Sequence, residues 1–191
     1  MQKERKDMTN REHYTPGAAA GAEIRKHGDT WTLVLVRDLS QPPATVWTAL
    51  TDPEQLREWA PYDSDRNLGT VGTATLSTVG APTPLVSKTT VRRADAPRLL
   101  EFNWGKQEIR WQLDPLAGGG TRLTLWHNID RGFISMGAAG WHICFDVLQR
   151  FLAGQPIGRI VGAQVMQFDG WQRLNAEYAK QLGAATLRHG S

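Results

Sequence analysis

The sequence predicts an α+β domain in which a curved antiparallel sheet wraps around one long C-terminal helix, with two short helices after the first long strand. Three observations lead to this prediction. Apolar residues alternate with period two in several short segments, the turns between the middle segments are short, and a strongly apolar helical segment follows them. A helix that is apolar over more than half of its circumference must be covered on more than one side, and a curved sheet provides that cover.

Composition limits the class of protein. A chain of 191 residues with 40% hydrophobic content fits one domain with an adequate core. Its single cysteine excludes an internal disulfide and a Cys-x-x-Cys metal site, and it suits a reducing compartment. The sequence contains neither a signal-peptide pattern nor an apolar run long enough to span a membrane. We therefore expect a cytoplasmic protein, either monomer or homodimer, that uses no cofactor and no metal.

The charged residues do not form a patch that would track nucleic acid. The net charge of +3 comes from 22 basic and 19 acidic residues spread along the chain, so we expect no nucleic-acid partner. The opening "MQKERKDMTNREHYTPGAAAG" mixes both signs without periodicity. We expect residues 1–21 to form a disordered tail and residues 22–191 to form a single domain.

The first folded elements are a hairpin and two short helices. In "TWTLVLVRDL" the side chains alternate as in a strand, and Gly28-Asp29 before it is a turn signal that pairs residues 23–27 with it. The stretch "PPATVWTALT" begins with prolines and buries one stripe, as a short helix does. Asp52 then acts as the N-cap of a second short helix, which Pro61 ends.

Four β-like segments follow, namely "PLVSKTTVRRAD", "RLLEFNWG", "QEIRWQLDPL" and "TRLTLWHNID", with Gly or Pro signals between them. Short connections of this kind indicate an antiparallel meander. Alternation places one set of side chains on its inner face: Leu100, Phe102, Trp104, Ile109, Trp111, Leu113, Leu123, Leu125, His127 and Ile129. Trp126 and Arg110 then lie on the outer face.

The segment "AGWHICFDVLQRFLAG" contains a histidine and the cysteine two positions apart, which raises the question of a catalytic pair. At about 100° per residue, His142 and Cys144 diverge by roughly 200° around a helix and cannot bond to each other. Cys144 lies on the apolar side with Trp141, so we expect it to act as a small core residue. His142 and Asp146 lie on the other side and can form an i,i+4 pair, so we expect a surface or structural role for His142.

Another amphipathic helix ends the chain. Trp171, Leu174, Tyr178 and Leu182 repeat at helical spacing, and Gly183 is its C-cap candidate. The segment "GQPIGRIVG" before it contains three glycines and a proline and breaks the preceding helix.

Two stretches resemble a known family. "PPATVWTALTDPEQLREWAP" is similar to the opening signature of the START-like SRPBCC superfamily, and "GWHICFDVLQRFLAG" resembles the Gly-Trp-His helix of its branch homologous to the activator of the heat-shock-protein-90 ATPase. The likeness covers about residues 24–183. It implies the helix-grip fold of START domains and birch-pollen allergens. It also implies a cavity, open to apolar ligands, between the concave sheet and the long helix. This chain departs from the family pattern in "GQPIGRIVGAQVMQFDGW", which continues past the usual end of that helix and is expected to form a flap beside the pocket.

The expected cavity lining comes from both of these elements. The sheet contributes Trp104, Trp111, Leu125 and His127, and the helix contributes Trp141, Phe145 and Leu148. Such a lining suits a mostly apolar ligand with one or two polar anchors. His127 is the natural anchor or general acid/base, although a lone inward histidine also commonly completes a core hydrogen bond. The tryptophans, equally, can simply fill the core.

Three hypotheses remain open at this point. The first and favoured one is a protein that binds a small hydrophobic or lipid-like molecule without turnover. The second is a cyclase-like or hydrolase-like enzyme on the same scaffold that uses His127, and we assign it no catalytic residue beyond that. The third is a regulator of a chaperone or stress pathway that binds a protein partner through the outer face near Trp126 and Arg110.

Overall fold

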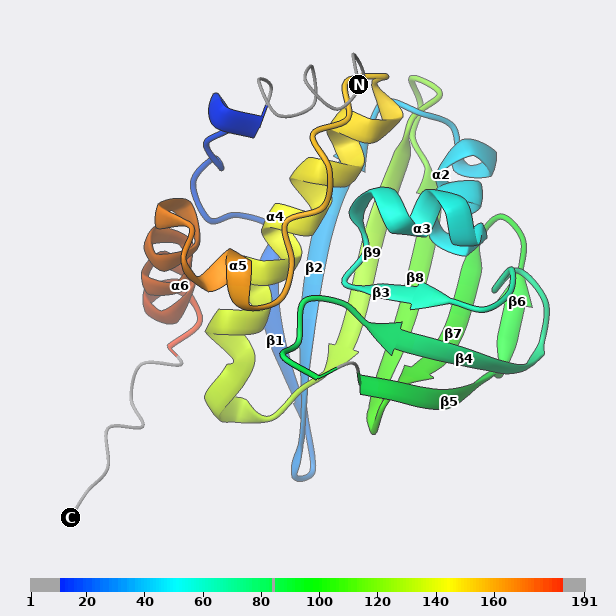
Figure 1. Ribbon diagram of the computed structural model, residues 1–191, viewed down its shortest axis with the longest axis horizontal. Helices are drawn as coiled ribbons and strands as arrows, with labels where there is room; N and C mark the ends of the chain where they lie inside the picture. The colour runs from blue at the N-terminus through cyan, green and yellow to red at the C-terminus, as the bar shows by residue number, and fades with distance from the viewer. Residues whose placement is uncertain (1–10, 84, 184–191) are drawn as a thin grey trace.

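The computed structural model describes residues 11–83 and 85–183, and Figure 1 shows their arrangement. A six-stranded antiparallel sheet curves around one long helix, α4 (Ile134–Leu152). Its strands lie in the order β1-β2-β9-β8-β7-β6. Their bounds are β1 Ala22–His27, β2 Thr30–Leu39, β6 Arg93–Asp95, β7 Leu99–Trp104, β8 Gln107–Pro115 and β9 Thr121–Asn128. The predicted α+β helix-grip fold is confirmed.

Strand register confirms the inner face that alternation predicted. Along β8 and β9, Ile109 pairs with His127, Trp111 with Leu125, and Leu113 with Leu123. Directly paired residues of antiparallel strands point to the same side of a sheet. All six are at most 3% exposed, so this side faces the core.

The expected hairpin and both short helices are present. β1 and β2 pair along their length around Gly28, whose φ of 58° is the left-handed conformation that glycine adopts most readily. The helices are α2 (Pro43–Thr51) and α3 (Pro53–Trp59). The Asp52 side chain accepts hydrogen bonds from the backbone N–H groups of Glu54 and Gln55, as an N-cap does.

A second sheet departs from the single predicted meander. It has three antiparallel strands in the order β3-β4-β5: β3 Tyr62–Ser64, β4 Gly72–Thr78 and β5 Leu85–Val91. Sequence patterns predict no structure for residues 62–78, because β3 has only three residues and β4 is rich in Thr and has few large apolar residues. These strands find their partners through tertiary pairing, such as Tyr62 with Thr78.

The C-terminal part packs onto the outer side of α4. A 3₁₀ turn, η1 (Arg131–Phe133), leads into α4, and after it come α5 (Ala163–Met166) and α6 (Asp169–Gln181). Trp171, Leu174 and Tyr178 are the buried face of α6, as predicted. Gly183 has the positive φ of a C-cap glycine. In the described part of the chain, we find no helix with the length and apolarity needed to cross a membrane.

Residues 11–21 were expected to belong to a disordered tail but instead pack against α4 and α6. Tyr14 and Ala19 are buried, and the Tyr14 ring stacks on Phe168. The Tyr14 hydroxyl donates a 2.6 Å hydrogen bond to Asp146, and Ala19 N–H donates to Glu177. The sequence gives little sign of this, because the contacts join residues more than 130 positions apart. Residues 1–10 of the expected tail lie outside the described residues.

We expect Tyr14→Phe to lower the free energy of unfolding by about 1.5–3 kcal/mol, the usual worth of a hydrogen bond to a charged group. The Asp146 carboxylate loses this donor while Arg37, at 2.6 Å, remains. Urea denaturation measures the difference. Thr15→Ala, at an exposed neighbouring position, is the control and should change stability little. Equal stability of Tyr14→Phe and the wild type would mean that this hydrogen bond does not stabilise the fold.

Candidate functional site

Most of the space between sheet and helix is filled by the protein's own aromatic rings. Trp111, at the centre, packs edge-on against Trp59 and Trp141 at centroid distances of 5.9 and 5.5 Å, and it also contacts Phe145. Four of the seven predicted ligand-binding residues are fully buried in this core and do not line the cavity described below: Trp111, Leu125, Phe145 and Leu148. In this region the tryptophans therefore fill the core, which is one of the two alternatives that the sequence left open.

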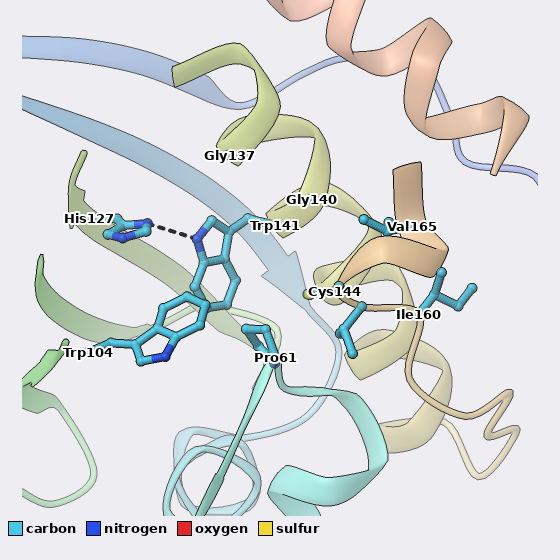
Figure 2. Close-up of a pocket in the computed structure, with 11 residues that line it drawn as sticks. Pro61, Trp104, His127, Gly137, Gly140, Trp141, Cys144, Ile160 and Val165 are labelled. Carbon is cyan, nitrogen blue, oxygen red and sulfur yellow. Dashed lines mark hydrogen bonds between the residues drawn. The ribbon is translucent and has the colours of Figure 1, made fainter. Parts of the chain in front are cut away.

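A smaller cavity remains at the side of α4 (Figure 2). Its volume is about 150 Å³. Eleven residues line it: Pro61, Trp104, His127, Gly137, Gly140, Trp141, Cys144, Ile160, Val161, Gly162 and Val165. In Figure 2 the three predicted members, Trp104, His127 and Trp141, gather on one side, and Ile160 and Val165 lie on the other. The structure thus brings together three predicted residues and eight others.

The helical side of the cavity exists because α4 carries small residues there. Gly137, Gly140 and Cys144 recur at i, i+3 and i+7 and so share one face of the helix. A Cβ atom added at Gly140 would meet no other atom within 4 Å, so the glycine leaves open space. The spacing of these residues was a readable signal, although the sequence analysis used only Cys144 and assigned it to the core.

The segment after α4 borders the cavity on its outer side. Ile160, Val161 and Gly162 belong to it, and Val165 follows in α5. Gly162 has φ 66°, and a Cβ there would lie 2.4 Å from the carbonyl oxygen of Gly80, in the turn between β4 and β5. Only glycine fits such a close backbone approach. The segment therefore lies beside the pocket, as expected of a flap.

An ion pair attaches this flap to the second sheet at a second point. The Arg159 guanidinium donates a 2.6 Å hydrogen bond to the Asp63 carboxylate on β3, and both side chains are partly buried. The flap is thus attached to the second sheet at Gly80 and at Asp63, and the residues between these attachments cover the cavity.

His127 is the polar group on the inner wall, and both of its ring nitrogens are already bonded. The Trp141 indole N–H donates to Nδ1 at 2.9 Å, and Nε2 lies 2.7 Å from the Gln107 side-chain oxygen. An indole N–H can only donate, so Nδ1 is the unprotonated nitrogen and Nε2 carries the hydrogen that Gln107 accepts. Burial lowers the pKa of His127 from 6.5 to about 4. At neutral pH the ring is therefore uncharged.

Cys144 and His142 occupy opposite sides of α4 and form no catalytic pair, as predicted. The Cys144 thiol is buried, and this desolvation raises its pKa to about 12, which keeps it protonated and unreactive. Of the surface and structural roles expected for His142, the structure shows the structural one, because α6 covers this residue: it is 4% exposed, and Nδ1 lies 2.8 Å from the Tyr178 hydroxyl. The expected contact with Asp146 is present at 3.5 Å but is buried.

The electrostatics of the cavity fit an uncharged ligand. Its lining includes no Asp, Glu, Lys or Arg side chain. Within residues 11–83 and 85–183, no group of three or more His, Cys, Asp or Glu side chains is arranged to hold a metal ion. What the arrangement offers is apolar contact area and aromatic faces, with a neutral imidazole fixed between Trp141 and Gln107.

A protein-family model matches the central part of the chain. The model for activator of Hsp90 ATPase homolog 1-like proteins matches residues 40–153, a range that runs from α2 to the end of α4. The chain belongs to this family. A search of curated proteins finds no match.

Solved structures of similar fold are distant in sequence. A conserved protein of unknown function from Enterococcus faecalis is 16% identical, with a TM-score of 0.64 and coverage of 95% of this chain and 96% of that one. CalU16 from Micromonospora echinospora is 20% identical, with a TM-score of 0.62 over 85% and 94%. A Bordetella parapertussis protein is 24% identical, with a TM-score of 0.57 over 88% and 96%. At these identities the likeness shows the family fold alone.

The depressed pKa of His127 makes stability depend on pH. Between about pH 6.5 and 4 the unfolded chain binds a proton at this histidine that the folded chain does not, so folding loses stability as pH falls through this window. The shift corresponds to about 3 kcal/mol. We expect His127→Asn, which keeps an acceptor for Trp141, to reduce the loss by an amount of this order.

Denaturation at pH 7 and pH 4.5 measures the effect as the difference between wild type and variant, which cancels the contributions of the carboxylates and of His142. Equal pH dependence of the two proteins would show that His127 titrates normally.

Proposed function

We propose that this protein binds a small, uncharged and mostly apolar molecule in the cavity between Trp104, Trp141 and the flap. The observation that carries the proposal is the cavity itself: an apolar space lined by three glycines, with an aromatic wall on one side and a flap fixed by Gly162 and Arg159 on the other. Concave apolar sites with few polar groups are the usual form of small-molecule sites.

The volume limits the size of the ligand. Drug-sized ligands occupy pockets of roughly 300–1,000 Å³, whereas this cavity measures about 150 Å³. An apolar cavity of about that volume holds benzene in a well-studied engineered case. We therefore infer that the buried part of the ligand is one ring or a short branched chain, which makes a bulky lipid a poor fit unless the flap moves.

Ligand binding is better supported than catalysis by His127. A general acid or base needs a nitrogen free to exchange a proton with substrate, and a pKa near the working pH. Both nitrogens of His127 bond to protein groups, and its pKa lies near 4. The histidine instead fixes the orientation of the Trp141 ring, which forms part of the cavity wall.

The partner-binding hypothesis has weaker support on the outer face of the sheet. Trp126, its expected apolar contact, is half-buried, and the guanidinium groups of Arg25 and Arg110 lie 4.5 and 5.5 Å from its ring centroid. The chain's own side chains thus cover much of the surface that a partner would use. Family membership suggests a chaperone connection, and no contact on this face favours it over the cavity.

Filling the cavity from the helix tests the proposal. Leucine at position 140 would project into the open space beside the glycine, so Gly140→Leu should reduce ligand affinity at least about tenfold. Stability should be unchanged or higher, because replacing a helical glycine by leucine favours the helix by up to about 1 kcal/mol. Binding is measured by native mass spectrometry of the freshly purified protein, followed by titration with a panel of small apolar ligands.

The matched control is Gly118→Leu in the turn between β8 and β9, where an added Cβ also meets nothing within 4 Å and the cavity is not involved. Its affinity should equal that of the wild type. A wild-type protein that carries no extra mass and shifts its melting temperature with no ligand of the panel would overturn the proposal. The search would then move to protein partners.

A further inference from the structure

A polar groove lies on the surface where the β1–β2 and β7–β8 turns meet the segment that leads from β9 into η1. Its volume is about 870 Å³. The lining includes three amide side chains, those of Asn103, Gln107 and Asn128, together with charged side chains of both signs. Of the described residues, Trp104 alone lines both this groove and the apolar cavity.

Three contacts show that a single layer of side chains separates the groove from the cavity. Trp104 borders both spaces. His127 lines the cavity, and its Nε2 lies 2.7 Å from the side-chain oxygen of Gln107, which lines the groove. Gly137 lines the cavity, and a Cβ added there would lie 2.7 Å from the side chain of Ile129, which lines the groove. The groove therefore lies directly outside the cavity, at the end where Figure 2 shows Trp104 and His127.

Trp104 is the part of this layer that a ligand would meet from both sides. Its side chain is half-buried, whereas His127 beside it is 3% exposed. The Trp104 ring stacks on the His127 imidazole at a centroid distance of 6.1 Å, and its indole N–H donates a 2.9 Å hydrogen bond to the Thr78 hydroxyl. Trp104 is also the last residue of β7, directly before a turn. A displacement of this one ring would therefore join the two spaces.

The two spaces differ in chemistry. The cavity lining has no charged side chain, whereas the groove lining includes the carboxylates of Asp29 and Asp130 and the cations of Lys106 and Arg131. The side chains of Asp29, Lys106 and Asp130 form no hydrogen bond or ion pair with another described residue. A hydroxyl group both donates and accepts, so it can bond to carboxylate, amide and ammonium groups alike. The groove thus suits an uncharged group that carries hydroxyls.

We propose that the ligand has two parts: an apolar part that fills the cavity, and an uncharged, hydroxyl-bearing part that lies in the groove, with the link between them passing beside Trp104. This inference rests on the proposed ligand-binding function and adds the polar part of the same ligand. Two weakly bound groups joined in one molecule lose their translational freedom only once. The joined molecule should therefore bind more tightly than either part.

Three related probes test this expectation. Anisole carries a phenyl ring on a methyl ether, methyl glucoside carries the sugar on a methyl ether, and phenyl glucoside joins the ring to the sugar through the same oxygen. We expect the wild type to bind phenyl glucoside at least about tenfold more tightly than either of the other two, because the sugar adds several hydrogen bonds to the contacts of the ring. Titration calorimetry measures the three affinities.

Two variants assign the parts of phenyl glucoside to their spaces. Gly140→Leu fills the cavity and should weaken the binding of anisole and phenyl glucoside alike, by at least about tenfold. The double variant Asp29→Ala, Asp130→Ala removes two acceptors from the groove and should weaken phenyl glucoside about 2- to 10-fold while leaving anisole unchanged. Both aspartates are exposed, so this variant should keep the wild-type melting temperature.

The matched control is the double variant Glu12→Ala, Glu54→Ala. It makes the same change in net charge at two exposed positions that do not line the groove. Its affinities for all three probes should equal those of the wild type.

The outcomes separate the two proposals. If the wild type binds neither anisole nor phenyl glucoside, both proposals fail. If it binds anisole but gains nothing from the sugar, or if the groove variant keeps the full advantage of phenyl glucoside, the cavity proposal stands and the groove proposal is overturned. Binding of phenyl glucoside that Gly140→Leu does not weaken would also overturn the groove proposal, because the phenyl ring would then lie outside the cavity.

Discussion

The contact between Trp141 and the concave sheet is the interaction on which the rest of the structure depends. Its indole N–H donates to His127 on β9, and its ring packs edge-on against Trp104 and Trp111 from β7 and β8. One side chain of α4 therefore contacts three neighbouring strands. Aromatic rings in such edge-to-face arrangements gain energy beyond the area they bury, so this residue fixes both the depth and the rotation of the helix.

The cavity follows from that placement. With α4 in this orientation, Gly140 and Cys144 border the cavity beside Trp104 and His127. A Cβ added at Gly140 would meet nothing within 4 Å, whereas Gly137 packs closely against Ile129. The segment after α4 borders the cavity on its outer side. Close packing is the rule in protein interiors, so an apolar space bounded by small residues on one wall and bulky ones on the other is consistent with a site that accepts a ligand.

The hydrogen-bond partners of the buried polar side chains in this core indicate what these side chains do. His127 and His142 both have buried partners, and burial lowers the pKa of each, so both act as neutral structural groups near neutral pH. Tyr62 and Trp111 are fully buried beside each other: burial raises the pKa of Tyr62, and the neighbouring Trp111 indole opposes that rise. Neither residue lines the cavity.

The sequence by itself determined the architecture, since period-two alternation along β7, β8 and β9 and the one-sided apolar pattern of α4 reflect local geometry that each segment carries alone. Alternation also identified His127 and Trp104 as inward residues, helical periodicity did the same for Trp141, and the Asp52 cap is likewise a local signal. Tertiary structure alone decided which inward residues fill the core and which border the cavity. That outcome depends on how far the Trp111 and Phe145 rings reach between sheet and helix. It decided also that residues 11–21 pack against α4 and α6 and that α6 covers His142, because such contacts join distant residues and leave no periodic trace in the chain.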